Sequence, residues 1–359
     1  MRKLLITAIL LSGLGQTLSA ADTIRRKGVE KAIVGEVTSA SREEVVIKLQ
    51  VGGKEEKIPA NEIDSIKWDA PTQSLLKATA TEGLLKKGEF DRAIEAWEEA
   101  LREGIAREVV KLDAEYSLAR ALYKKSLVNR DFVKQAVDKL KEFSKKDHFR
   151  SFDGVTMLGD LALSTGDLDA ANIAFNQLAK APWLEMQMAG KIGSGRALLA
   201  KKDINGAKKL FDEAANASAK SGLEKSRQFE AFVGQAHCLL ELKQPKDALV
   251  IVEKVIQDAG EDDSRAQAEA YVRQGDCQRA LGEDQKKTLL AYLHVDVIPE
   301  FAEHRDVHAE ALYRLSQLWP AVGEKDRGTS AAERLKENYP DSEWAKMPAQ
   351  AKEKDEPSN

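Results

Sequence analysis

The hydrophobic pattern of the chain changes once, close to residue 70. Before that point apolar side chains recur at every second position, most clearly in the run Val45, Ile47, Leu49 and Val51. A period of two predicts a strand with one buried face. After residue 74 the apolar positions recur every three or four residues, which is typical of amphipathic helices. The sequence therefore predicts a small β region followed by a long helical region.

Residues 22–69 are predicted to form five short strands, of which the pattern locates four. The pattern places strands over residues 31–38, 43–51 and 55–58, a single helical turn over 61–63, and a last strand that ends at Trp68. The Gly52-Gly53 pair is a turn signal, and Pro59 ends the strand before it because proline cannot donate a ladder hydrogen bond. A flat sheet of five short strands would leave two exposed edges. We therefore expect it to close into a small five-stranded β-barrel.

Small and aromatic side chains recur at a regular distance in the helical region, residues 74–347. Ala171 and Phe175 form one such pair, and Ala207 and Phe211 repeat it 36 residues later. Small residues allow two helices to approach closely, and the aromatic ring fills the space that their crossing leaves. These spacings predict about seven helix pairs, stacked so that each covers the apolar face of the next.

The repeat resembles the tetratricopeptide repeat (TPR), a unit of 34 residues with Leu-Gly in its first helix and Ala and an aromatic residue in its second. Leu158-Gly159 and the late Tyr339-Pro340 fit that pattern. The resemblance implies a mainly α fold, a right-handed α-solenoid of about seven TPR-like helix pairs. Residues 22–69 resemble the SH3-like or Sm-like barrels that precede helical repeats in some bacterial envelope proteins.

The N-terminus predicts export. Arg2 and Lys3 precede the apolar stretch 4–14, which is shorter than the roughly 20 residues that span a bilayer. Ser19-Ala20-Ala21 provides small residues before a cleavage site, so we expect a periplasmic or secreted mature chain without a membrane span. An uncleaved anchor is the alternative. The expected division is a signal peptide over 1–21, the β-barrel over 22–69, a linker over 70–73, TPR-like repeats over 74–347 and a disordered tail over 348–359.

The charge balance argues against a nucleic-acid partner. The chain has 55 basic and 59 acidic residues, a net charge of −4, and loss of Arg2 and Lys3 would make it more acidic. Binding to nucleic acid needs a concentrated basic face. In the β region, acidic residues such as Glu43 and Glu44 offset the lysines, so RNA binding by an Sm-like barrel is not expected.

Cys238 and Cys277 occupy the same position in successive repeats, two residues after the small residues Ala236 and Gly275. Neighbouring helix axes lie about 8–10 Å apart, whereas a disulfide needs Cα atoms within about 7 Å. We therefore expect two buried, unbridged thiols.

No catalytic motif stands out, and we expect no enzyme activity and no cofactor. Gly193-Ser194-Gly195 resembles part of a nucleophile elbow, but it falls inside a predicted first helix, where small residues serve packing. His304 and His308 are four residues apart and would share one helical face, which raises the hypothesis of a surface metal site. A solvated helix start is the interpretation we favour, with no metal.

TPR arrays bind peptides or domains in a concave groove, and the repeat frame predicts which side chains line it. The commonest groove position holds Asp160, Arg196, His237, Asp276 and Gln317. One turn earlier the frame places Thr156, Ile192, Val233, Val272 and Tyr313. Capture of a C-terminal carboxylate needs several converging cationic or amide side chains, and this set has one arginine. An extended segment or a folded protein is the expected ligand; a groove without a specific ligand is the alternative.

The sequence therefore favours a non-catalytic exported scaffold or adaptor that binds a protein or peptide partner in the cell envelope. The β region would add a second contact, because tandem modules gain avidity. A cell-wall or carbohydrate-binding accessory protein is one alternative, and it needs exposed aromatic side chains such as Tyr313 and Trp319 near the groove. An enzyme with an unrecognised site is the third hypothesis.

Overall fold

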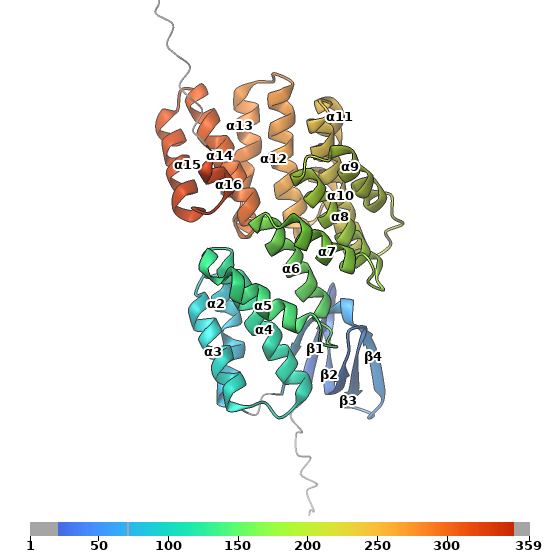
Figure 1. The fold of residues 1–359 in the computed structure, drawn as a ribbon. Coiled ribbons are helices and arrows are strands. Elements are labelled where there is room, and N and C mark those ends of the chain that lie inside the picture. The colour runs from blue at the N-terminus through green and yellow to red at the C-terminus, as the bar shows by residue number, and fades with distance from the viewer. Residues whose placement is uncertain (1–20, 70–71, 348–359) are drawn as a thin grey trace, which may run out of the picture.

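The computed structural model describes residues 21–69 and 72–347. A sheet packs beside the first helix pairs, and the later pairs continue away from it as a curved array (Figure 1). The fold is mainly helical, as predicted. None of the described helices combines the length and the apolarity needed to cross a membrane. Residues 1–20 of the predicted signal peptide, Ala70 and Pro71 of the linker and the predicted tail lie outside the described residues.

Five antiparallel strands form one sheet. They are β1 (Asp22–Arg26), β2 (Val29–Ala40), β3 (Glu44–Leu49), β4 (Glu55–Pro59) and β5 (Ile63–Lys67), and the 3-10 helix Ala60–Glu62 joins the last two. In the order β4-β3-β2-β1-β5, strands β1 to β4 form a meander, and β5 pairs with β1 at the other edge of the sheet. The alternating pattern located β2 to β5. It did not locate β1, because Ile24 is the only buried apolar side chain in that strand.

The prediction of a closed β-barrel is wrong. β4 and β5 are the edge strands, which pair with β3 and β1 and not with each other. The helical region covers the apolar face of the sheet instead, since Ile24, Ile47 and Ile58 share one hydrophobic core with Leu118 and Leu122. The helices already remove this face from water, so curling into a barrel would bury little further apolar surface.

Within the described residues the helices form seven successive pairs, in agreement with the prediction. The pairs are α1 (Gln73–Ala80) with α3 (Phe90–Glu103), α4 (Glu108–Ser126) with α5 (Val133–Phe143), α6 (Ser151–Thr165) with α7 (Leu168–Leu178), α8 (Leu184–Ala200) with α9 (Ile204–Ala215), α10 (Gly222–Glu241) with α11 (Pro245–Asp258), α12 (Ser264–Ala280) with α13 (Gln285–Val297), and α14 (Arg305–Ala321) with α15 (Lys325–Asn338). The short α2 (Glu82–Lys86) lies within the first pair, and α16 (Glu343–Lys346) follows the last. The first helices α8, α10, α12 and α14 also pack against one another, which gives the array an inner layer.

Aromatic rings seated on glycines hold the pairs together, as the repeat pattern predicts. The ring of Phe175 in α7 lies over Gly159 of its own pair and over Gly193 of the next pair. A Cβ added to these glycines would come within 2.5 and 2.3 Å of that ring. Phe211 in α9 lies over Gly234 in the same way, at 2.3 Å. The packing interpretation of the Gly193-Ser194-Gly195 segment is therefore confirmed.

The two cysteines are unbridged and buried, as predicted: Cys238 lies in α10 and Cys277 in α12. Burial raises the pKa of each thiol to about 12. Both side chains therefore stay protonated at neutral pH and act as small core residues.

Asp22, the first residue of β1, fastens the sheet to the helices. Its side chain is 1% exposed and accepts two hydrogen bonds from Arg107 just before α4, at 2.8 and 2.7 Å. The backbone N–H groups of Val37 and Asp69 donate to it at 2.8 and 2.9 Å. Burial by itself would raise the pKa of Asp22, but these hydrogen bonds and the charge of Arg107 outweigh burial and lower it. The ionised carboxylate thus joins the two regions.

Candidate binding groove

The first helices line a large groove on the inner side of the array. Its volume is about 1920 Å³, and most of its wall comes from α6, α8, α10, α12 and α14. Side chains of α4 and α5 bound it at one end, and the segment 339–347 bounds it at the other. These two ends are remote in sequence, so the groove depends on the curvature of the whole array (Figure 1).

Six of the ten residues predicted to face the groove do line it. They are Thr156, Asp160, Arg196, Val233, His237 and Asp276. The side chains of Ile192 and Val272 instead lie in the core between helices, at 1% and 0% exposed. Tyr313 packs on Trp344 with ring centroids 5.4 Å apart, and Gln317 donates a hydrogen bond to Ser316 at 3.2 Å. The predicted frame therefore fails completely only in α14, while α8 and α12 each place one of their two predicted residues in the groove.

Arg196 in α8 is the first member of an ion-pair network that crosses the groove wall. Its guanidinium lies 3.3 Å from Glu230 of α10 and 3.0 Å from Glu269 of α12. Glu269 also pairs with Arg265 at 3.0 Å, and Arg265 reaches Asp306 of α14 at 2.6 Å. Four successive first helices are thereby linked by charge.

A second group of ion pairs lies between α12 and α14. Arg273 pairs with Asp276 at 2.8 Å and with Glu310, while Arg314 pairs with the same two carboxylates at 3.1 and 3.3 Å. The Tyr292 hydroxyl donates to Asp276 at 2.9 Å. These residues thus have partners within the fold, and their charges are largely neutralised.

The arginines keep the buried acids of the network ionised. Burial alone would raise the pKa of Glu230 and of Asp306, but nearby arginines, including Arg227 and Arg265, lower both to about 2. Separating a partly buried acid from its paired arginine costs considerable free energy. The ion pairs therefore hold the wall of the groove in one arrangement.

Two polar side chains that line the groove do not take part in this ion-pair network. Asp160 of α6 and His237 of α10 make no side-chain hydrogen bond with the part of the chain that the structure describes. Burial raises the pKa of Asp160, although Arg265 and Arg196 act against that rise. Burial, then Arg273, lowers the pKa of His237 to about 3, so the imidazole is neutral at neutral pH. Both side chains are available to a ligand.

Sequence reasoning missed Glu230, Glu269, Arg273, Glu310 and Arg314 as groove residues. A signal was present, because acids and arginines stand three or four residues apart in these helices. Arg227 pairs with Glu230 and Arg314 with Glu310 at such spacings. Opposite charges at these spacings share one helical face. The spacing does not say whether that face points into a groove or into solvent.

His304 and His308 do not form a common site. The His304 ring lies 2.8 Å from the Ser264 hydroxyl, whereas the buried His308 ring contacts Tyr339 and Asp296 through its two nitrogens, at 2.5 and 3.0 Å. The interpretation of a solvated helix start is wrong for His308, which is a core residue. Among the described residues, no three His, Cys, Asp or Glu side chains lie together as a metal site.

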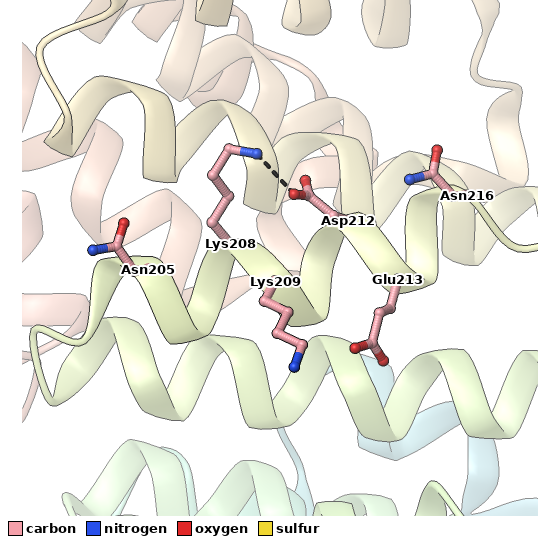
Figure 2. Close-up of a pocket in the computed structure, with 6 residues that line it drawn as sticks. All are labelled: Asn205, Lys208, Lys209, Asp212, Glu213 and Asn216. Atoms are coloured by element: carbon pink, nitrogen blue, oxygen red, sulfur yellow. Dashed lines mark hydrogen bonds and ion pairs between the residues drawn. The ribbon is translucent and has the colours of Figure 1, made fainter.

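A second, smaller depression lies on the outer helix α9. Its volume is about 460 Å³, and its lining residues come from that one helix and from its C-cap residue Asn216, as Figure 2 shows: Asn205, Lys208, Lys209, Asp212, Glu213 and Asn216. Lys208 and Asp212 form an ion pair at 2.7 Å along the helix surface. A hollow walled by one helix surface cannot enclose a ligand, so the groove is the better candidate site.

Comparison with known proteins identifies the fold. No protein-family model matches the chain, and no curated protein matches its sequence. A Rap protein complexed with Competence and Sporulation Factor is similar in structure, with 16% identity, a TM-score of 0.50 and coverage of 76% of this chain and 77% of that one. A tetratricopeptide repeat protein from Parabacteroides merdae is similar too, with 14% identity, a TM-score of 0.50 and coverage of 77% and 98%. The protein thus has a TPR-type helical-repeat fold.

Proposed function

We propose that the protein is a non-catalytic scaffold or adaptor that binds a protein partner in its inner groove. The observation that carries the proposal is the groove volume of about 1920 Å³. Pockets for small molecules typically measure about 300–1,000 Å³, so this groove suits an extended peptide or a protruding element of a folded protein. The Rap protein with a similar fold forms a complex with Competence and Sporulation Factor, which is consistent with ligand binding by such arrays.

The charges of the groove favour an internal segment of the partner over its C-terminal carboxylate. Arg196, the arginine that the sequence placed there, is already paired with Glu230 and Glu269. An incoming carboxylate would have to compete with both of these acids. Asp160 and His237 offer instead a hydrogen-bond acceptor and a neutral imidazole, which suit backbone amide groups and polar side chains.

The proposed location is the periplasm or the exterior of a bacterial cell. Strand β1 begins at Asp22, directly after the predicted cleavage positions, so cleavage there would remove no strand residue. The test is to isolate the protein from the envelope fraction and sequence its N-terminus. A start at Ala21 or Asp22 supports export; an intact Met1 recovered only from the cytoplasm contradicts it.

The aromatic residues that suggested the alternative, a carbohydrate-binding accessory protein, do not lie in the groove. That alternative relied on Tyr313 and Trp319 as exposed aromatic side chains. Trp319 is a core residue, and Tyr313 packs on Trp344 and on the same core. Neither ring lines the groove, so neither offers the flat surface on which a sugar would stack.

Site-specific photo-crosslinking in whole cells tests the scaffold function. A photoreactive phenylalanine derivative replaces His237 or Asp160 in the groove, and, as matched controls, Ile173 of α7 or Val250 of α11, which are exposed on the outer helices. We expect discrete adducts with one or a few proteins from the groove positions and none of the same proteins from the outer ones. Adducts confined to the outer positions, or no adducts at all, would contradict the proposal.

A further inference from the structure

The inner helices α6, α8, α10, α12 and α14 end in turns of one type. In each turn, the N–H of a residue just after the helix donates to the carbonyl of the residue three positions earlier in the chain. The N–H of the following residue donates to the carbonyl five positions before its own. The residues at the first of these positions are Gly166, Lys202, Lys243, Gly282 and Gly323. Such a turn needs a left-handed backbone, which glycine adopts most easily.

Two of these five turns carry lysine where the others carry glycine. Lys202 has φ 63° and Lys243 has φ 61°, and they are the only non-glycine residues with positive φ in the part of the chain that the structure describes. The left-handed region is unfavourable for a residue with a side chain, because its Cβ lies too close to the following carbonyl oxygen. A side chain kept under strain points to a role that glycine could not perform.

Both lysines line the groove, and so does Arg279 in the last turn of α12. We define these three side chains as the basic rim. Each is exposed and has neither a side-chain hydrogen bond nor an ion pair with the described residues. The helices that carry them pack side by side in the order α8, α10, α12. The rim is therefore a row of three unpaired cations along one edge of the groove.

The acidic neighbours of the rim have other partners, with one exception. The Asp203 carboxylate caps α9 by accepting from the Gly206 N–H at 2.9 Å, and Glu283 pairs with Lys287. The Asp284 carboxylate caps α13. Glu241 is the one acid that lines the groove beside the rim without an ion pair in the described chain. None of these acids forms an ion pair with Lys202, Lys243 or Arg279 in the described chain, so the three cations of the rim stay unpaired.

We propose that the basic rim binds an acidic segment of the partner protein, held extended across the ends of α8, α10 and α12. The inference rests on the proposed function and names the chemistry of its partner. Adjacent helix axes lie about 10 Å apart, so the rim spans about 20 Å. An extended chain rises about 3.3 Å per residue, so six or seven residues with two or three carboxylates match this length. Unlike the paired arginines of the groove wall, these cations can receive carboxylates without breaking an internal ion pair.

A structural role for the rim is the competing explanation. Cations at helix C-termini interact favourably with the helix dipole. Such a role would alter stability and leave ligand binding unchanged. The decisive experiment therefore measures binding and stability on the same variants.

The test compares two triple variants that lose the same charge. The rim variant carries Lys202→Gln, Lys243→Gln and Arg279→Gln. The control carries Lys209→Gln, Lys254→Gln and Lys286→Gln, which removes exposed lysines from the second helices α9, α11 and α13 of the same repeats. The probe is a fluorescein-labelled peptide of about 12 residues with alternating Asp and Ser, and its Asn-for-Asp counterpart is the blank. Binding is followed by fluorescence anisotropy, and stability by urea unfolding.

We expect the Asp peptide to bind the rim variant at least about tenfold more weakly than the native chain, and the control variant to bind it within about twofold. Binding to the native chain should weaken steeply between about 0.05 M and 0.5 M NaCl, and the rim variant should lose most of that dependence. A charge-keeping variant, Lys202→Arg, Lys243→Arg and Arg279→Lys, should restore binding even if the rim variant proves unstable.

Equal losses in the rim and control variants would overturn the proposal, as would binding of the Asn peptide as strong as that of the Asp peptide, or no binding by the native chain. The crosslinking experiment at His237 separates this failure from failure of the proposed function. A crosslinked partner segment that is not acidic, captured equally by the rim variant, would refute the acidic-segment inference and leave the scaffold function standing.

Discussion

Individual buried polar residues make this fold sensitive to its surroundings, and His148 is the clearest case. Its side chain is 0% exposed, its Nδ1 accepts from the Arg150 N–H, and its ring lies 4.4 Å from that of Phe149. Burial, then the charge of Arg150, lowers the pKa of His148 to about 3. It belongs to the segment 144–150, which accepts hydrogen bonds from Arg42 in the connection between β2 and β3.

We expect stability to fall as the pH drops below about 6.5, partly because of His148. In the unfolded chain the imidazole takes up a proton near pH 6.5, whereas the folded state resists protonation until about pH 3. The contribution of the neutral His148 side chain to the free energy of unfolding is fully present above pH 6.5. It is lost as the pH falls toward 3, at up to about 1.4 kcal/mol per pH unit. Urea unfolding of the native chain and of His148→Gln between pH 7.5 and pH 4.5 checks it. The variant should show a smaller pH dependence; identical dependences would contradict the assignment.

At the scale of single elements, the contact between an aromatic ring and a glycine decides how helices pair. Phe175 of α7 is wedged between two first helices, α6 and α8, because neither presents a Cβ at the crossing. One ring therefore joins a pair internally and also joins it to the next pair. This arrangement explains why the repeats cannot fold singly and must stack.

Substitution of Gly193 by alanine should destabilise the protein by about 2 kcal/mol, because the new Cβ would lie 2.3 Å from the Phe175 ring. The sign is opposite to the gain of about 0.5–1 kcal/mol that alanine normally brings to a helix interior. Gly222→Ala at the start of α10 is the matched control, because nothing lies within 4 Å of its added Cβ. Urea unfolding should give a loss for the first variant and none for the second; equal effects would refute the packing role.

At the scale of the whole molecule, the sheet and the first helix pairs share one hydrophobic core. The sheet is consequently a fixed part of the array's N-terminal end. At the inner wall, ion pairs connect α8 to α10, α12 and α14, so the curvature that shapes the groove is supported by charge as well as by apolar packing. Both features place rigid structure behind the proposed binding surface.

Asp22→Asn should lower the free energy of unfolding by about 2 kcal/mol, because it removes the buried charge that pairs with the half-buried Arg107. Hydrogen exchange should accelerate together in the sheet and in α4, because the two share a core. Glu44→Gln, which removes an exposed ion pair with Lys57 on the same sheet, is the control and should change little. Faster exchange confined to the sheet would show that it unfolds independently.

Sequence reasoning succeeded where structure depends on near neighbours. The period-two pattern gave four of the five strands and the helical region gave seven pairs, because strand and helix periodicities are local properties. It also identified the glycines of α8 as packing residues. It failed on β1, since one buried apolar side chain, Ile24, makes no pattern.

What the sequence by itself determined is thus the class of fold: a short alternating region, then recurring small and aromatic residues that compel helix pairs to stack. Tertiary structure alone decided that the sheet stays open, because Arg107 and the helical core that cover it are remote from the strands in the chain. It alone decided that Arg273 and Arg314 face the groove while Val272 and Tyr313 do not. The physical reason is that the curvature of the array fixes which helical face points inward and which distant charges meet. The hydrophobic period of a single helix does not determine that curvature.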